Sequence, residues 1–267
     1  MGPYTAVYKL AMPEGTLELL HKFQTDFREI EPSSNCCRWS RDNQGLAVGG
    51  DDKVIRLYKV TSKDFKGEMP LVCELNEGGH TEAINSLDIS PGKTLIVSAG
   101  NDCTASIFDL ATKKCIKKLS FRDKNCKDAK GNPDSSNFLI RGCFFTNCGR
   151  FVYLLAAKMR YKSFLVKYEV LINGSVIDFR PISTLEVHTN AVTRMLPSRD
   201  DLIISIATSD GFIKVVNESS QSIVLTQKRH NLPVTAMGFL NSSDFASSPN
   251  TVVTGSADYL YNIIGIP

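Results

Sequence analysis

The stretch 79–109 alternates apolar runs with turn-forming residues. Apolar positions recur over 83–87, a second run covers 95–98, and a third ends at Phe108-Asp109. A Ser-Pro-Gly segment separates the first two runs, and an Asn-Asp pair separates the last two. Short apolar runs bounded by such residues predict β-strands joined by tight turns.

The same pattern returns along the whole chain. A two-strand fragment over 4–23 precedes five units that each contain three or four strand-like runs. These units cover 35–76, 79–120, 138–187, 188–228 and 230–266. Residues 1–267 are therefore predicted to form a single all-β domain built from repeats.

A His followed by an Asp in the turn after the second strand recurs in three units: His80 with Asp102, His188 with Asp210, and His230 with Asp258. The separation is 22 positions in the first two pairs (80 to 102, 188 to 210) and 28 in the third (230 to 258). A Ser- and Asn-rich insertion over 241–250 accounts for the longer separation. Asp52 occupies the same turn in the unit over 35–76 and is predicted to play the role of Asp102.

The Asp positions give the repeat length, with 50 residues from 52 to 102 and 48 from 210 to 258. The interval from 102 to 210 is 108 residues and contains the most degenerate unit. A period near 50 with four strands per period resembles the WD repeat and predicts a β-propeller, with five complete blades and part of another. A β-sandwich gives no reason for the constant His-to-Asp spacing. Tyr58 and Phe108 stand where that repeat usually has Trp.

Candidate chemistry centres on His80, Ser98 and Asp102, which match the residue types of a hydrolytic triad. A catalytic site is not normally copied once per repeat, so the recurrence favours a buried structural network holding each blade together. A hydrolase that uses His80 and Asp102 is kept as an alternative hypothesis. We predict no catalytic, cofactor-binding or metal-binding residue, because the sequence has no phosphate-binding loop, zinc motif or nucleophile elbow.

Composition adds little beyond this. The 267 residues carry a net charge of +3, which is too small to indicate nucleic acid or membrane binding by itself. One cluster of basic residues is a candidate surface for an acidic partner or an anionic membrane: Lys113, Lys114, Lys117, Lys118 and Lys124. The alternative is a solvated outer strand, where lysines discourage aggregation. Nucleic acid is not predicted as a partner, because no aromatic residues interleave with these lysines.

Several stretches are more specific than a general WD repeat. They are Gln24-Thr25-Asp26-Phe27, the segment CCRWSRDN over 36–43, the segment over 46–60, and HNLPVTAMGFL over 230–240. Together they resemble the cytosolic propeller of the endoplasmic reticulum (ER) exchange factor for the Sar-type small GTPase, the prolactin regulatory element-binding protein family. That GTPase starts assembly of the COPII vesicle coat. The resemblance runs from about residue 17 to 267.

The resemblance implies a seven-bladed propeller on the cytosolic face of the ER membrane, followed by a C-terminal membrane anchor. It also implies a Sar-type GTPase as partner and a glycine-rich, potassium-binding loop in the first blade as the exchange element. This sequence has no such glycine run, so no catalytic residue is transferred and a truncated propeller is expected. A non-catalytic scaffold in ER export is the alternative.

Exposed blade edges are expected at Tyr4–Leu10 and Tyr259–Ile264. They predict either a homodimer through strand pairing or a distorted closure of the propeller.

Overall fold

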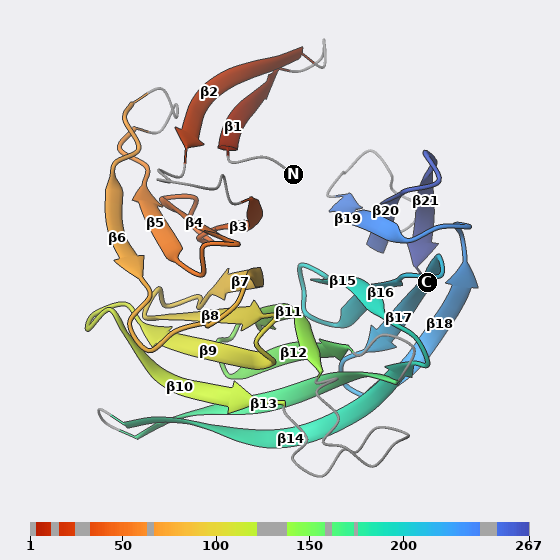
Figure 1. Ribbon diagram of the computed structural model, residues 1–267. Helices are drawn as coiled ribbons and strands as arrows, with labels where there is room; N and C mark the ends of the chain where they lie inside the picture. Colours follow the sequence, from red (N-terminus) through yellow and green to blue (C-terminus); the bar gives the residue numbers. More distant parts are fainter. Residues whose placement is uncertain are drawn as a thin grey trace, which may run out of the picture. The chain divides into compact units, whose positions relative to one another are not determined.

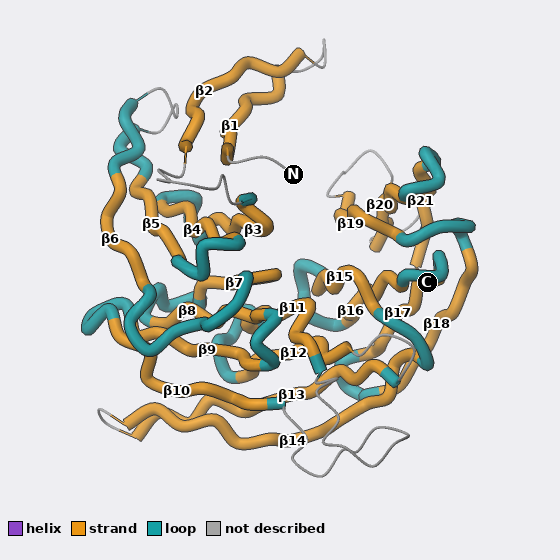
Figure 2. The backbone as a smooth tube through the Cα atoms, in the orientation of Figure 1, coloured by secondary structure: helices purple, strands orange, loops and turns teal. Residues whose placement is uncertain are grey.

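The structure is a computed structural model that describes most of the chain. The described residues are 4–11, 16–24, 33–62, 67–121, 138–157, 162–173, 176–240 and 250–266. They contain strands, turns and loops and no helix (Figure 2), and none of them forms a helix that could cross a membrane. The chain divides into two compact units, 1–120 and 121–267.

The first unit contains a two-stranded sheet and two four-stranded antiparallel sheets (Figure 1). The two-stranded sheet pairs β1 (Tyr4–Ala11) with β2 (Thr16–Gln24). The next sheet has the order β3 (Ser34–Trp39), β4 (Gly45–Gly50), β5 (Ile55–Lys59) and β6 (Leu71–Leu75). The third has the order β7 (Ile84–Ile89), β8 (Leu95–Gly100), β9 (Thr104–Asp109) and β10 (Lys114–Ser120).

The second unit contains three antiparallel sheets. The first consists of β11 (Leu139–Phe145), β12 (Phe151–Ala157), β13 (Ser163–Asn173) and β14 (Val176–His188). The next consists of β15 (Val192–Pro197), β16 (Ile203–Thr208), β17 (Phe212–Asn217) and β18 (Ser222–Lys228). The last has three strands among the described residues: β19 (Val234–Leu240), β20 (Asn250–Ser256) and β21 (Tyr261–Ile266).

Each of the five larger sheets follows chain order, so every strand pairs with the next strand in sequence. This meander, repeated five times, is the blade topology predicted from the repeats. One difference concerns the third and fourth strands of the degenerate unit. The apolar pattern of the sequence predicts strands over 163–170 and 183–187, whereas β13 continues to residue 173 and β14 begins at residue 176. The extra pairs, such as Leu171 with Asp178, lie where several side chains are exposed, so they lack a strong apolar alternation. That all the repeats form a single domain stays a prediction.

A hydroxyl-capped turn joins the first two strands in four sheets. Ser40, Ser90, Thr146 and Ser198 each accept, at the side-chain oxygen, a hydrogen bond from the backbone N–H five residues later, at 2.9 to 3.1 Å. The residue three positions after each hydroxyl has a positive φ of 54° to 69°. Local hydroxyl-to-backbone bonds are a common way to fix a tight turn. The turn also occurs in the degenerate unit, at Thr146, where the His-to-Asp pair is missing.

Apolar side chains pack between neighbouring sheets within each unit. In the first unit, Ile55 and Leu75 of one sheet pack with Ile84 and Phe108 of the next, and all four are at most 1% exposed. In the second unit, a similar core contains Tyr153 and Ile206. The second strands β8, β12 and β16 are buried on both faces, which explains why they read as continuous apolar runs.

Candidate functional site

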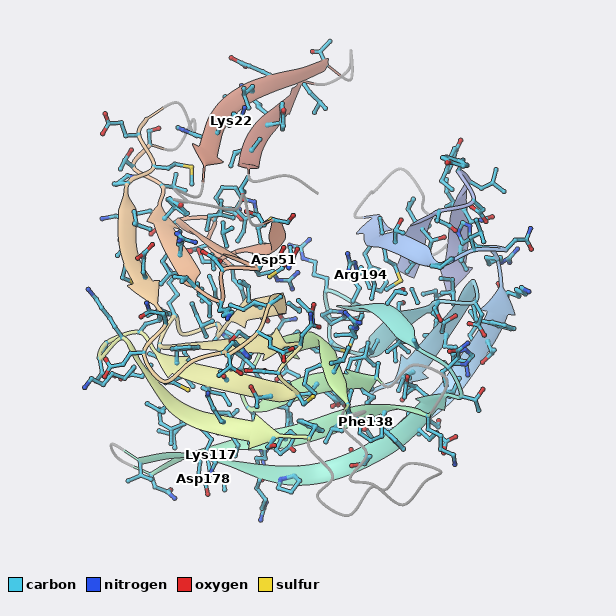
Figure 3. All side chains as sticks on the ribbon, viewed as in Figure 1. Lys22, Asp51, Lys117, Phe138, Asp178 and Arg194 are labelled. Atoms are coloured by element: carbon cyan, nitrogen blue, oxygen red, sulfur yellow. The ribbon has the colours of Figure 1, made fainter. Side chains whose placement is uncertain are left out.

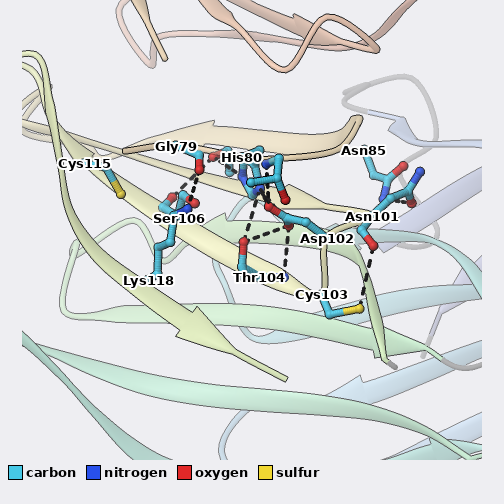
Figure 4. A network of polar contacts seen from close by, with 12 residues as sticks. Gly79, His80, Asn85, Asn101, Asp102, Cys103, Thr104, Ser106, Cys115 and Lys118 are labelled. Atoms are coloured by element: carbon cyan, nitrogen blue, oxygen red, sulfur yellow. Dashed lines mark hydrogen bonds and ion pairs between the residues drawn. The ribbon is translucent and has the colours of Figure 1, made fainter. Parts of the chain in front are cut away.

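The His80 side chain is the centre of a buried polar network in the first unit (Figure 4). Its Nδ1 lies 3.0 Å from Asp102 Oδ1, and its Nε2 lies 2.8 Å from the Ser98 hydroxyl. A carboxylate only accepts hydrogen bonds, so Nδ1 carries the proton and donates it to Asp102. Asp102 also accepts bonds from the Thr81 and Thr104 backbone N–H groups and from the Thr104 hydroxyl. The network therefore connects the segment that precedes β7 to the turn between β8 and β9.

The electrostatics of this network keep the Asp102 carboxylate ionised. Burial acts to raise the pKa of Asp102, but the hydrogen bonds from His80, Thr81 and Thr104 outweigh it and hold that pKa well below its usual value. The His80 side chain is 0% exposed and that of Asp102 is 1% exposed. A substrate cannot reach either group, so these residues cannot act as the active site of the hydrolase considered in the sequence analysis.

The other two His residues repeat the network with different details. His230 Nδ1 lies 3.1 Å from Asp258 Oδ2, and Thr254 supplies the hydroxyl at Nε2, four positions before the Asp as Ser98 is before Asp102. In the sheet with His188 that position is Ile206, which offers no hydroxyl. The His188 ring instead turns its Nε2 to Asp210, at 2.9 Å.

The contacts of Asp52 differ from those predicted by analogy with Asp102. Its carboxylate pairs with the Arg56 guanidinium, and it accepts a bond from the Val54 N–H at 3.5 Å. The residue 22 positions before it is Ile30 rather than a His, and this residue lies outside the described part of the chain. Among the described residues Asp52 therefore anchors an arginine rather than an imidazole.

The predicted lysine cluster lies on and just before β10, the fourth strand of its sheet. Lys118 donates to the Gly79 carbonyl, and Lys114 lies 3.8 Å from Glu77 Oε1 (Lys117 is labelled in Figure 3). Cys115 and Leu119 alternate with the exposed positions and face inward. Lys124 lies outside the described residues. Lys118 and Lys114 thus contact their own unit, while the cluster as a partner surface stays a prediction.

A shallow cavity of about 240 Å³ opens between the two four-stranded sheets of the first unit. Leu57, Val72 and Leu110 line it, together with Lys59 and Lys93. Lys93 is paired with Asp42, whose pKa is lowered to about 2 by hydrogen bonds from Lys93 and Ser40. The cavity is thus mainly apolar and has no group placed for chemistry.

A second polar network, missed by the sequence analysis, links two sheets of the second unit. Glu218 Oε1 accepts bonds from the Tyr153 hydroxyl at 2.7 Å and from Lys167 Nζ at 2.5 Å. Gln221 donates to the Tyr153 oxygen, and the Lys167 ammonium lies 4.1 Å from the centre of the Phe151 ring. Burial and the bond to Glu218 raise the pKa of Tyr153, so the hydroxyl remains a donor. The sequence signal is a tyrosine inside the apolar strand β12 and a lysine in the interior of β13, which also contains Glu169.

No His, Cys, Asp or Glu cluster of the described residues could hold a metal ion. Every His-to-Asp pair described above is bonded within its own repeat, so these motifs maintain the fold.

Comparison with known proteins agrees with this architecture. The model of the WD domain, G-beta repeat, matches residues 25–59, 71–109 and 179–217. The chain carries WD40 repeats. The β-propeller domain of Cps50 (Swd1) from Myceliophteria thermophila superposes with a TM-score of 0.60 at 16% identity, covering 88% of this chain and 65% of that domain. The fold is therefore an all-β WD-repeat propeller, with five blade-like sheets among the described residues.

Curated relatives are other WD-repeat proteins of varied roles. Eukaryotic translation initiation factor 3 subunit I of Brugia malayi is 25% identical over 35% of this chain. Cleavage stimulation factor subunit 50 of Arabidopsis thaliana is 31% identical over 40% of this chain. The matched segments span 27% and 26% of those two proteins. The chain thus matches only about a quarter of the length of each of these two relatives, and neither is an exchange factor by name.

Proposed function

We propose that this WD-repeat propeller is a protein-interaction module of ER export that binds a Sar-type small GTPase and takes part in its nucleotide exchange. The burial of the His80–Asp102 and His230–Asp258 pairs is the observation that carries the non-enzymatic part of the proposal. With His80 and Asp102 buried and bonded within one sheet, the groups best suited to covalent chemistry are committed to the fold.

The identity of the partner rests on the sequence resemblance over 36–43, 46–60 and 230–240. These segments include β4 and β5 in the first unit and β19 in the second. Exchange would proceed by displacing nucleotide and magnesium from the GTPase, so it needs complementary surfaces and no nucleophile. In the resembling family the potassium loop of the first blade performs that displacement, and no glycine run of this kind stands in this sequence.

Release of fluorescent GDP from a Sar-type GTPase tests the proposal. We expect the chain alone to bind the GTPase with little acceleration of release, and a longer protein that also carries a glycine-rich potassium loop to accelerate it strongly. A Ras-type GTPase provides the control for specificity. If neither protein changes GDP release from the Sar-type GTPase or binds it, the exchange-factor proposal is wrong.

The alternative is a scaffold that binds export components without acting on the GTPase. The relatives support this alternative because they differ in role while sharing the repeat, and one fold can host many unrelated functions. It predicts that binding to the Sar-type GTPase is absent or leaves its GDP release rate unchanged in both proteins.

A further inference from the structure

The cavity between the two four-stranded sheets of the first unit coincides with a glycine at a position that is large and apolar elsewhere. The residue five positions after each turn hydroxyl begins the second strand, and it is Leu95, Phe151 or Ile203 in three sheets. In the sheet of β3 to β6 the same position is Gly45, which lines the cavity. A glycine has no side chain, so it leaves empty the space that a large apolar residue takes up in the other sheets.

In the second unit, the equivalent residues pack in the groove between neighbouring sheets. Phe151 packs against a core that includes Ile204 of the next sheet. Ile203 packs in a core with Val252 of the sheet that follows its own. A large side chain at this position therefore closes the groove, and Gly45 leaves it open.

The residues around this position are charged in the second unit and apolar in the first. Leu57 holds in β5 the place of Lys167 in β13, opposite the same bulge of the fourth strand. Leu110 corresponds to Glu218, since each donates its backbone N–H to the carbonyl of the residue just before its second strand. The Lys167–Glu218 ion pair of the second unit is thus replaced by two leucines that line the cavity.

A β-bulge places Val72 at the mouth of the cavity. Leu57 pairs with Cys73 and Tyr58 with Leu71, so Val72 is the extra residue of β6. Its side chain lines the cavity and is still 54% exposed. The same bulge occurs in β10, β14 and β18, so it belongs to the repeat. Bulges re-aim a side chain and are frequent next to binding sites, and here the bulge borders an open apolar cavity.

The charged groups at the rim of the cavity are basic. Lys59 and Lys93 line it, and none of the described Asp or Glu residues does. The Lys93 ammonium is paired with Asp42. Lys59 is exposed, and no described carboxylate forms an ion pair with it. Charge complementarity therefore favours a ligand that has a carboxylate beside an apolar group.

The size of the cavity suits one large side chain. Its volume is about 240 Å³, whereas pockets for drug-sized ligands measure about 300 to 1,000 Å³. Water in an apolar cavity has few polar partners, so an apolar side chain that displaces it gains free energy. A carboxylate next to that side chain can pair with Lys59 at the rim without being buried.

We propose that this cavity binds a partner protein through one large apolar side chain, Leu or Phe, in an acidic segment. The apolar side chain fills the space that Gly45 leaves, in contact with Leu57 and Leu110. A neighbouring Asp or Glu of the same segment pairs with Lys59. The site goes beyond the proposed GTPase partner and does not depend on it.

NMR spectra of the methyl-labelled chain with capped peptides Glu-Glu-X-Glu-Glu test the site, where X is Leu, Phe or Ala. We expect the Leu and Phe peptides to shift the methyl signals of Leu57, Val72 and Leu110. The Ala peptide should bind at least about 10-fold more weakly, because it buries less apolar surface. A Leu peptide with lysine in place of glutamate should bind about 3-fold more weakly or less, because it lacks the pairing with Lys59.

Gly45→Leu closes the cavity and is the decisive variant. A Cβ on Gly45 would lie 3.5 Å from Ser40 Oγ and 3.6 Å from the Tyr58 carbonyl oxygen, which are ordinary contacts. The variant should therefore fold, unfold thermally no earlier than the unmodified chain, and bind the Leu peptide at least about 10-fold more weakly. Gly238→Leu is the matched control: nothing lies within 4 Å of an added Cβ there, and this variant should bind the peptide unchanged.

Lys59→Glu provides a second variant at an exposed position, in case Gly45→Leu does not fold. It should reverse the preference, so that the lysine peptide binds more tightly than the glutamate peptide. Lys53→Glu changes an exposed lysine outside the cavity lining and should keep the original preference. Four results would each overturn the proposal: no shift of the three methyl signals, unchanged binding to folded Gly45→Leu, equal binding of the Ala peptide, or an unchanged preference in Lys59→Glu.

Discussion

At the scale of single residues, the repeated His and Asp act through burial and hydrogen bonding. Asp102 accepts bonds from four different groups, which holds its carboxylate ionised inside the protein. Ser98, Thr254 and Ile206 occupy equivalent positions, and the orientation of the neighbouring His ring follows from whether a hydroxyl is there. One substitution in the second strand thus changes how the imidazole is used while the His-to-Asp contact persists.

Asp102→Asn should lower the free energy of unfolding by about 1 to 3 kcal/mol at pH 7, because the amide cannot accept all of these bonds. The pKa of Asp102 is lowered in the folded protein, so its stabilising effect is complete above the unfolded value near 4 and is lost as the pH falls below it. The difference between the variant and the unmodified protein should therefore shrink between pH 5 and pH 2. Urea unfolding at several pH values measures it.

Glu82→Gln is the control for this experiment, since Glu82 is exposed in the same unit. It should leave stability nearly unchanged at every pH. A constant deficit of Asp102→Asn down to the lowest pH would contradict the assignment of a lowered pKa.

Gly211 offers a backbone test at the turn that follows Asp210. Its φ is +85°, and a Cβ there would lie 1.9 Å from the His230 carbonyl oxygen. Gly211→Ala should therefore destabilise the protein by at least about 2 kcal/mol. Gly238→Ala is the matched control, because nothing lies within 4 Å of its added Cβ. Chemical denaturation measures both, and equal stability of the two variants would show that the turn relaxes without strain.

At the scale of elements, features within one repeat could be predicted from the sequence, whereas contacts between sheets could not. The turn residues and the His-to-Asp spacing are local or strictly periodic, so the blades could be predicted from residues such as Asp102 and His188. The bulge at Arg141 and the bond from Lys167 to Glu218, 51 positions apart, depend on how neighbouring strands and sheets register. A single sequence carries no direct signal for such contacts, so the partner of Lys167 could not be predicted from the sequence.

The Lys167–Glu218 pair should stabilise the contact between its two sheets. Its side chains are 11% and 21% exposed, so we expect a coupling free energy of about 1 to 3 kcal/mol in a double-mutant cycle with Lys167→Met and Glu218→Gln. Lys162 and Glu186 form a more exposed pair in the same unit, with side chains 62% and 39% exposed. That pair should couple by less than about 1 kcal/mol. Equal coupling in both pairs would show that burial is not the source of the effect.

At the scale of the whole molecule, the proposed function is binding of another macromolecule, since His80 and Asp102 are buried and bonded to each other. The hydroxyl-capped turn recurs in four of the blade-like sheets among the described residues, and the His-to-Asp pair recurs in three repeats. Because these repeated groups are committed to the fold, we expect a partner to be recognised by side chains that do not repeat. The predicted homodimer through the edges at Tyr4–Leu10 and Tyr259–Ile264 stays a prediction of the same kind.

Calorimetric titration of this chain with a nucleotide-free Sar-type GTPase tests the central proposal most directly. We predict saturable one-to-one binding that GDP and magnesium weaken, with no binding to a Ras-type GTPase under the same conditions. Asp102→Asn, at a temperature where it remains folded, should bind as well as the unmodified chain, since Asp102 supports the fold only. The absence of any heat of binding to the Sar-type GTPase would contradict the account.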